Sequence, residues 1–107
     1  MTTLLRLSEA EISSRASEFP GWHFSDKQLK RTFQFADFVS AFGFMTSVAL
    51  LAERLQHHPE WCNVFNRVDI TLNTHEVDGV SENDIVLAMQ INKLVATSSV
   101  EPTSPPI

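Results

Sequence analysis

Residues 22–56 read WHFSDKQLKRTFQFADFVSAFGFMTSVALLAERLQ, and the period of the apolar residues changes within this stretch from two to about 3.6. Before Asp37, apolar and polar residues alternate on both sides of Asp26-Lys27, which is typical of two antiparallel strands joined by a tight turn. After Asp37, a good N-terminal cap, the apolar positions follow the period of a helix through Gln56. The stretch therefore predicts a strand pair followed by a long helix.

The apolar residues of the predicted helix 37–56 cover about half of its circumference, which is more than contact with one sheet requires. A deeply buried helix in a small domain would explain this width. Alternatively, Phe44, Val48 and Leu51 would face a partner subunit. The pattern alone leaves both interpretations open.

Two similar helix-start motifs flank this central part of the chain. A serine and an acidic residue stand three positions apart at 8–11 and again at 81–84, which is the spacing of a capping box. We expect the first helix to end near Glu18 and the last to run from position 81 to about Val95. The last helix would bury Ile85, Leu87, Ala88, Ile91 and Leu94.

The segment 64–74 alternates almost strictly, with Val64 on the same side as three later apolar residues. It could be one long strand or two strands around a two-residue turn at Asn66-Arg67. We favour the hairpin, which gives the order helix–strand–strand–helix–strand–strand–helix. The predicted fold is α+β, a four-stranded antiparallel sheet with three helices packed on one face (αββαββα).

The chain has 107 residues, which suits a single domain over 1–96, and the Pro- and Ser-rich segment 97–107 is predicted to be disordered. A net charge of −5 and scattered basic residues argue against direct nucleic-acid binding and against anionic membranes. Cys62 is the only cysteine, so a disulfide framework is excluded. No segment reads as a signal peptide or a bilayer-spanning helix. We expect a cytoplasmic protein that could also enter the nucleus.

Residues 53–60 read ERLQHHPE and hold the polar groups best suited to chemistry. Pro59 should end the helix near His57, and Glu53 stands four residues before His57 on the same helical face. A carboxylate at that spacing can orient an imidazole and raise its pKa, and a helix C-terminus favours the protonated ring too. The alternative is an ordinary polar helix end. His75 follows a strand and precedes a turn, a common place for site residues.

Other chemistries have weaker support. Zinc could bind three histidines with Glu53 or Glu60, but adjacent histidines tend to diverge and the helical i, i+4 histidine pair is absent. Nothing near Cys62 would depress the pKa of a nucleophilic thiol, and the three glycines form no phosphate loop. We therefore rate metal and thiol chemistry below acid–base chemistry.

Residues 31–91, RTFQFADFVSAFGFMTSVALLAERLQHHPEWCNVFNRVDITLNTHEVDGVSENDIVLAMQI, carry a spaced motif that resembles the pterin-4a-carbinolamine dehydratase family. In animals the family is also known as the dimerization cofactor of a liver homeodomain transcription factor. The likeness covers roughly residues 20–95 and is nearer to eukaryotic members, through AFGFMT, VAL and THE. The motif positions are Glu53, His57, His58, Pro59, Phe65, His75 and Asp84.

The resemblance implies dehydration of 4a-hydroxytetrahydrobiopterin to quinonoid dihydropterin, which recycles tetrahydrobiopterin after aromatic amino-acid hydroxylation. Loss of the C4a hydroxyl needs a proton donor at the departing oxygen and an acceptor for the N5 proton. Histidine can serve either role near neutral pH, and one such group contributes about 10²–10⁴-fold. The resemblance also implies a homodimer or homotetramer, with pterin as the substrate and no metal or redox cofactor.

By motif position the catalytic residues are the three histidines, with His57 and His75 as the acid–base pair and His58 binding and orienting the pterin. Which of the pair donates the proton stays open. Glu53 would support His57, and Asp84 would either touch the site or only cap the last helix. The substrate-contacting positions of the family fall on Gln56, His57, His58, Asn73, Thr74, His75 and Glu76. Trp61 would pack against the pterin ring.

This chain departs from the animal pattern at three places. Animal members commonly have an acid at Gln56 and a serine at Asn73, and the family often has Gly-Gly at Asp78-Gly79. These changes bear on substrate affinity and loop shape, since all three histidines are present. The rival interpretation is a binding module that docks a transcription factor, as a coactivator, or an assembly client through the helix 37–56.

Overall fold

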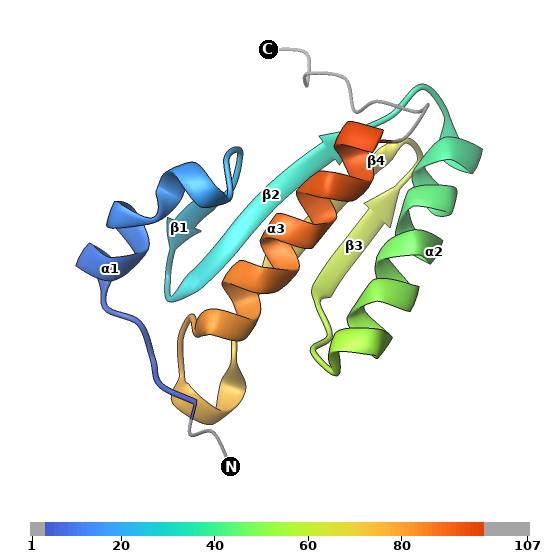
Figure 1. Cartoon of the computed structure of the whole chain (residues 1–107). Helices are drawn as coiled ribbons and strands as arrows, with labels where there is room; N and C mark the ends of the chain where they lie inside the picture. The colour runs from blue at the N-terminus through green and yellow to red at the C-terminus, as the bar shows by residue number, and fades with distance from the viewer. Residues whose placement is uncertain (1–3, 98–107) are drawn as a thin grey trace.

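The computed structural model describes residues 4–97, which form a four-stranded antiparallel sheet with helices on one side (Figure 1). The strands lie in the order β1-β2-β4-β3. The predicted α+β class and the order αββαββα are confirmed, with two short 3-10 turns added. The bounds are α1 (Glu9–Ser14), η1 (Ala16–Glu18), β1 (His23–Ser25), β2 (Gln28–Gln34), α2 (Phe38–Leu55), β3 (Glu60–Val64), β4 (Arg67–Leu72), η2 (His75–Val77) and α3 (Glu82–Thr97).

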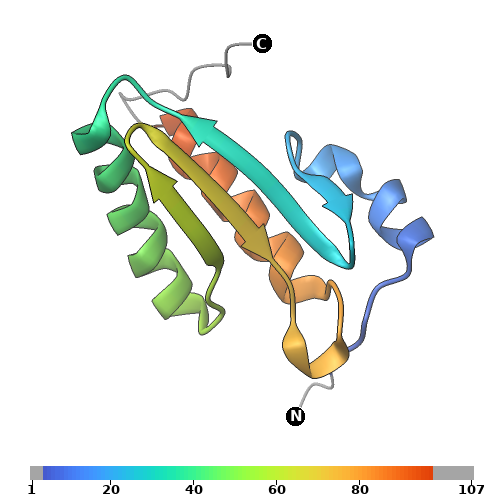
Figure 2. The ribbon, with the colours of Figure 1, turned by 180° about the vertical axis from the view of Figure 1, so that it is seen from behind.

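The core lies between the sheet and the helices, because alternate residues of β2 and β4 point to the helix-covered face. Figure 2 shows the opposite face of the sheet, which is free of helices. Apart from Thr97, the predicted disordered tail 97–107 lies outside the described residues. Four of the five residues predicted to be buried on α3 are buried, and Leu94 is half-buried. The largest core side chains of the sheet and α3 are Leu29, Phe33, Ile70, Leu72, Ile85, Leu87 and Ile91.

The predicted capping box starts α1, where the Ser8 side chain accepts from the Glu11 backbone N–H and the Glu11 side chain accepts from the Ser8 backbone N–H. The helix ends at Ser14, however, not near Glu18. The Ser14 hydroxyl donates to the Glu11 carbonyl at 2.8 Å, so a side chain takes an acceptor that the helix would use. The next residues form the separate turn η1.

The first hairpin forms at the predicted place, whereas the second is shifted by one residue. Asp26 and Lys27 have φ angles of 51° and 65°, the conformation of a type I′ turn. In the second hairpin Val64 pairs with Arg67, so the turn residues are Phe65-Asn66 rather than Asn66-Arg67. Val64 therefore shares the open face with Arg67 and is 52% exposed, against the prediction that it lies on the same side as Val68, Ile70 and Leu72.

The end of β2 accounts for the position of this second turn. The Phe35 N–H donates to the Asn66 carbonyl at 2.8 Å, and the Asn66 side-chain amide donates to the Phe35 carbonyl at 2.8 Å. These two bonds place Asn66 inside the turn. The alternation within 64–74 could not reveal them, because they depend on a residue about 30 positions earlier.

Helix α2 is capped by Asp37, whose side chain accepts from the Ser40 N–H at 2.8 Å, as predicted. Val48 and Leu51 are buried and Phe44 packs against Phe33 and Phe35, with ring centroids 4.8 and 4.9 Å apart. The interpretation that these α2 residues face a partner is therefore wrong. The exposed large apolar residues of α2 are Phe38, Val39, Phe42 and Leu50.

By length and mean hydropathy (1.4 over 18 residues), α2 is the one helix in the described part of the chain that could cross a membrane. On these two measures alone, the expectation that no segment could do so is wrong. Packing of α2 against β4 and α3 accounts for part of its apolar composition, since 22% of the helix is buried within the described residues.

Candidate functional site

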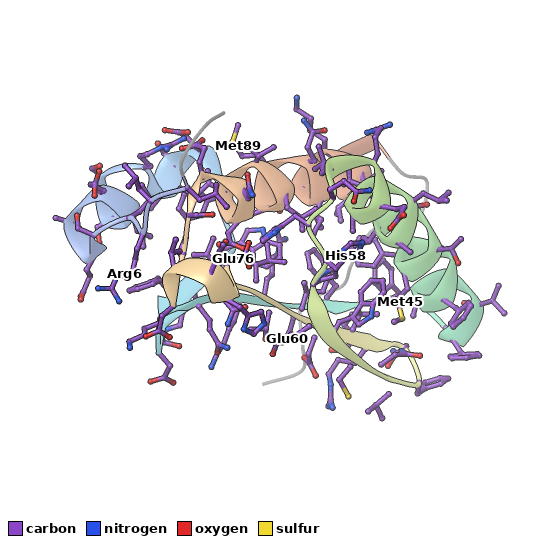
Figure 3. All side chains as sticks on the ribbon, turned by 90° about the horizontal axis from the view of Figure 1, so that it is seen from below. Arg6, Met45, His58, Glu60, Glu76 and Met89 are labelled. Carbon is purple, nitrogen blue, oxygen red and sulfur yellow. The ribbon has the colours of Figure 1, made fainter. Side chains whose placement is uncertain are left out.

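The residues before β3, the loop after β4 and the start of α3 meet at one end of the sheet. Because β3 runs antiparallel to β4, Glu60 at the start of β3 lies opposite Thr71 near the end of β4. The residues before β3 therefore lie beside those that follow β4. A bridge between Thr74 and Gly79 closes the loop that holds η2 and leads into α3. In Figure 3, His58, Glu60 and Glu76 lie in the central part of the view and come from these segments.

Helix α2 ends sharply just before the histidine pair. Gln56 adopts the left-handed conformation (φ 54°), and its N–H donates to the Glu53 carbonyl at 3.2 Å. The His57 N–H donates to the Ala52 carbonyl at 3.1 Å, which completes a Schellman-type helix end. The chain therefore turns away from the helix axis at Gln56, and His57 and His58 follow a non-helical backbone.

Asp84 is fully buried and connects His57 to the start of α3. One carboxylate oxygen, Oδ1, lies 2.5 Å from Nε2 of His57. The other, Oδ2, accepts from the Thr74 hydroxyl at 2.7 Å and from the Ser81 N–H at 2.9 Å. Asp84 thus caps α3 and also contacts the site, so the two roles left open by the sequence coexist.

The pKa of His57 is raised above its ordinary value, chiefly by the hydrogen bond to Asp84. Burial of the ring opposes this shift, while the negative charges of Asp84 and of the more distant Glu76 add to it. The His57 side chain is 12% exposed. The arrangement therefore favours a protonated imidazole that is held in one orientation and still has access to solvent.

Glu53 does not support His57, contrary to the prediction. Its Oε1 lies 2.9 Å from Nε2 of His58, and the two side chains are 71% and 62% exposed. The i, i+4 geometry assumed for Glu53 and His57 requires helix through position 57, and the helix ends at Leu55. The two adjacent histidines point to different partners, one buried and one exposed.

His75 begins η2 and is exposed, with its Nε2 3.3 Å from Oε1 of Glu60. Each of the three site histidines therefore has a carboxylate near Nε2. Glu60 was predicted only as a possible zinc ligand, because no local pattern in the sequence indicates a pairing of positions 60 and 75. The capping contact predicted between Ser81 and Asp84 is present, since the Asp84 side chain accepts from the Ser81 N–H, whereas the contact of the Ser81 hydroxyl with Thr74 was not predicted.

The remaining predicted substrate-contacting residues surround this arrangement. The Gln56 side-chain amide donates to the Glu53 carbonyl at 2.7 Å, and Trp61 is half-buried against the core. Asn73 is half-buried and Glu76 is exposed. Thr74 is 1% exposed, and its hydroxyl lies 2.7 Å from both Asp84 Oδ2 and Ser81 Oγ. The structure therefore commits the Thr74 hydroxyl to the protein itself.

Within residues 4–97, no three His, Cys, Asp or Glu side chains converge so as to hold a metal ion. Cys62 is exposed on β3. The expectation of metal-free and cofactor-free chemistry remains a prediction.

Comparison with known proteins places these residues in a family context. The sequence profile of the family described as pterin 4 alpha carbinolamine dehydratase matches residues 5–94. A relative from Prochlorococcus marinus (strain MIT 9303), provisionally named pterin-4-alpha-carbinolamine dehydratase, is 52% identical over 94 residues, 88% of this chain and 97% of that protein. A relative from Rhizobium johnstonii with the same provisional name is 48% identical and covers 85% of this chain and 92% of that one. Nearness to eukaryotic members stays a prediction.

Two solved structures share the fold. One is a crystal structure of a transcriptional coactivator/pterin dehydratase from Brucella melitensis, with a TM-score of 0.79 and 47% identity, over 83% of this chain and 97% of that one. The other is a pterin dehydratase-like protein identified as a RuBisCO assembly factor in the alpha-carboxysome, with a TM-score of 0.62 and 21% identity, over 76% and 96%. At that identity the second likeness concerns the fold alone.

Proposed function

The chain belongs to the pterin 4 alpha carbinolamine dehydratase family, and on that premise we propose that it removes water from 4a-hydroxytetrahydrobiopterin to give quinonoid dihydropterin. The reaction would recycle tetrahydrobiopterin after aromatic amino-acid hydroxylation. The observation that carries the proposal is the pair of His57 and buried Asp84, which raises the pKa of the imidazole and so favours its protonated form.

In the proposed step, the C4a–O bond breaks while a protonated histidine gives its proton to the departing hydroxyl, so that water leaves. A second histidine takes the proton from N5, and the N5 electron pair forms the N5=C4a double bond. No electrons are exchanged with another reagent. Each proton transfer by a positioned side chain contributes about 10²–10⁴-fold.

We assign the proton donor to His57 and the proton acceptor to His75. The raised pKa of His57 supports the first assignment, because the imidazole stays protonated to a higher pH than an ordinary histidine. His58, exposed beside Glu53, would bind and orient the pterin, and Trp61 would pack against the pterin ring. The substrate would contact the segments 56–58 and 73–76.

The test is the rate of dehydration of 4a-hydroxytetrahydropterin generated in situ by a hydroxylase. We expect the wild type to exceed the rate in buffer, and His57→Ala and His75→Ala each to lose most of that acceleration while remaining folded. A double variant no slower than the single ones would indicate that the two residues act as a unit. A wild-type rate equal to that in buffer would refute the proposal.

A second candidate function is a binding module, favoured by the exposed apolar residues Phe38, Val39 and Phe42 on the first turns of α2. Such residues are typical of contact surfaces, which would serve a homodimer, a homotetramer or a protein partner. Sedimentation of the wild type and of Phe42→Glu tests this use of α2. An unchanged mass in the variant would argue against self-association through α2. A cytoplasmic and nuclear location also remains part of this proposal.

A further inference from the structure

We propose that Thr74 and Ser81 are positioning residues for the dehydration: they hold Asp84 so that His57 keeps a proton on Nε2 and exchanges the reaction's proton through Nδ1. This inference rests on the proposed function for its catalytic part. Its structural part, the tautomer of His57, can be measured without any activity. The roles follow from how the hydrogen-bond donors around Asp84 must be arranged.

The Oδ2 atom of Asp84 is surrounded by donors. The Ser81 backbone N–H can only donate, and it lies 2.9 Å away. The Thr74 hydroxyl donates to the same oxygen at 2.7 Å. All of these groups are buried, with Asp84 and Ser81 at 0% exposure and Thr74 at 1%. A carboxylate fixed by two buried donors cannot rotate without leaving one of them unpaired, which is costly away from water.

Ser81 fixes the direction of the Thr74 hydroxyl. The two side-chain oxygens are 2.7 Å apart, and Thr74 has only one hydroxyl proton, which it gives to Asp84. The Ser81 hydroxyl must therefore donate to Thr74, and its own oxygen accepts from the Asn83 N–H at 3.2 Å. The hydrogen bonds run in one direction, from Ser81 through Thr74 to Asp84. No buried side-chain polar atom in the described part of the chain lacks a partner.

This direction determines which nitrogen of His57 can react. With Oδ2 accepting two hydrogen bonds, the carboxylate also accepts at Oδ1, where it lies 2.5 Å from Nε2 of His57. With Asp84 ionised, the Nε2 atom carries a proton in both the neutral and the charged ring. The Nδ1 atom has no hydrogen-bond partner among residues 4–97 and is not sealed from solvent. It is the atom that gains and loses the proton delivered to substrate.

The alternative is a protonated Asp84 that donates to Nε2, which would leave His57 neutral with its proton on Nδ1. The two arrangements differ in the ¹⁵N shifts of the ring. Long-range ¹H–¹⁵N correlation spectra of the labelled full chain, recorded across pH with His57→Gln to assign the signal, distinguish them. We expect Nε2 to stay protonated and Nδ1 to titrate, and the reverse pattern would overturn the inference.

Thr74→Val tests the positioning role, because valine keeps the shape and removes the hydroxyl. We expect the pKa of His57 to fall toward its ordinary value, since a less constrained Asp84 makes a weaker hydrogen bond. We expect kcat to fall by up to about 10²-fold, the effect of a misplaced catalytic group. Thr74→Ser, which keeps a hydroxyl at this position, should leave the pKa of His57 and kcat close to their wild-type values. An unchanged or increased pKa in Thr74→Val would overturn the role of Thr74.

Thr32→Val is a matched control, since the Thr32 hydroxyl also donates to a carboxylate, Asp69, at 2.7 Å, but on the open face of the sheet. It should leave both the pKa of His57 and kcat unchanged. If Thr74→Val does not fold, Ser81→Ala replaces it, because this change removes only the hydroxyl at the start of the chain of bonds and keeps the backbone N–H. A lowered pKa of His57 supports the inference there too, and an unchanged pKa overturns it.

The two parts of the proposal can fail separately. If the wild type does not accelerate dehydration, the proposed function fails, while the spectra still decide which nitrogen of His57 carries the fixed proton. If the wild type is active but His57 carries its fixed proton on Nδ1, the function stands and the positioning roles of Thr74 and Ser81 do not.

Discussion

His57 and His58 are neighbours in the chain, and yet their carboxylate partners lie in opposite environments. The first pairs with a fully buried aspartate that is itself held by Thr74 and Ser81, two residues of the loop before α3. The second pairs with Glu53, where both side chains are mostly exposed. Water screens an exposed ion pair and leaves it free to move, whereas a buried one is fixed by its other hydrogen bonds. A histidine–carboxylate pair can therefore have a different role when its histidine is one position further along the chain.

The largest difference between the His57–Asp84 pair and the His58–Glu53 pair should appear in the free energy of unfolding. Asp84→Ala leaves the Ser81 N–H and the Thr74 hydroxyl buried without their acceptor and removes the partner of His57. We expect the free energy of unfolding to fall by about 3–5 kcal/mol, as when one member of a buried pair is removed. Glu53→Ala should change it far less. Urea unfolding of both variants measures the difference, and equal losses would mean that burial does not distinguish the two pairs.

Catalysis should show the next largest contrast. His57→Gln removes the proposed proton donor, so we expect kcat to fall by about 10²-fold or more, which corresponds to about 2.7 kcal/mol at 1.36 kcal/mol per tenfold. His58→Gln should act mainly on KM, because it weakens binding of the substrate. Steady-state kinetics of the two variants provide the measurement. If His58→Gln lowered kcat as much as His57→Gln, the assigned roles would have to be exchanged or shared.

The pH dependence of stability gives a smaller effect, with a defined sign. Because the pKa of His57 is raised in the folded protein, its pair with Asp84 stabilises the fold fully below the unfolded pKa of about 6.5. That contribution is lost as pH rises through the folded-state pKa. The stability difference between wild type and His57→Gln should therefore be larger near pH 6 than near pH 9, a comparison made by urea unfolding. A difference that grew with pH would contradict the assignment.

Glu53→Gln should have the smallest effect of the four. An exposed ion pair contributes about 0–1 kcal/mol, so we expect the dehydration rate to change by about fivefold or less. Asp84→Asn, the same change at the buried partner, is the matched comparison and should slow the reaction much more. If the glutamate variant were the slower of the two, the exposed pair would be the more important one.

Local patterns predicted most of the fold. The type I′ turn at Asp26-Lys27, the capping box at Ser8 and the cap at Asp37 each depend on residues within a few positions of one another. The second hairpin was displaced by one residue because Asn66 is held by Phe35, a contact across the sheet. The first helix was predicted too long because the Ser14 side chain competes for a backbone carbonyl.

In the site too, local spacing was predictable from the sequence and contacts between distant residues were not. The spacing of residues 53–59 identified the histidines and a nearby carboxylate, since helix geometry is local and a proline ends a helix predictably. The partner of each histidine could not be read from the sequence. Asp84 reaches His57 from 27 positions away because β3 and β4 pair and η2 leads back into α3.

By itself the sequence determined the elements, their order, the family and the residues that could carry chemistry, because these depend on periodicity and on short spacings. Only the tertiary structure decided which carboxylate meets which histidine, and that Thr74 and Ser81 donate hydrogen bonds to Asp84. Side-chain pairing and burial depend on where distant segments meet in space. No single segment of the sequence contains that information.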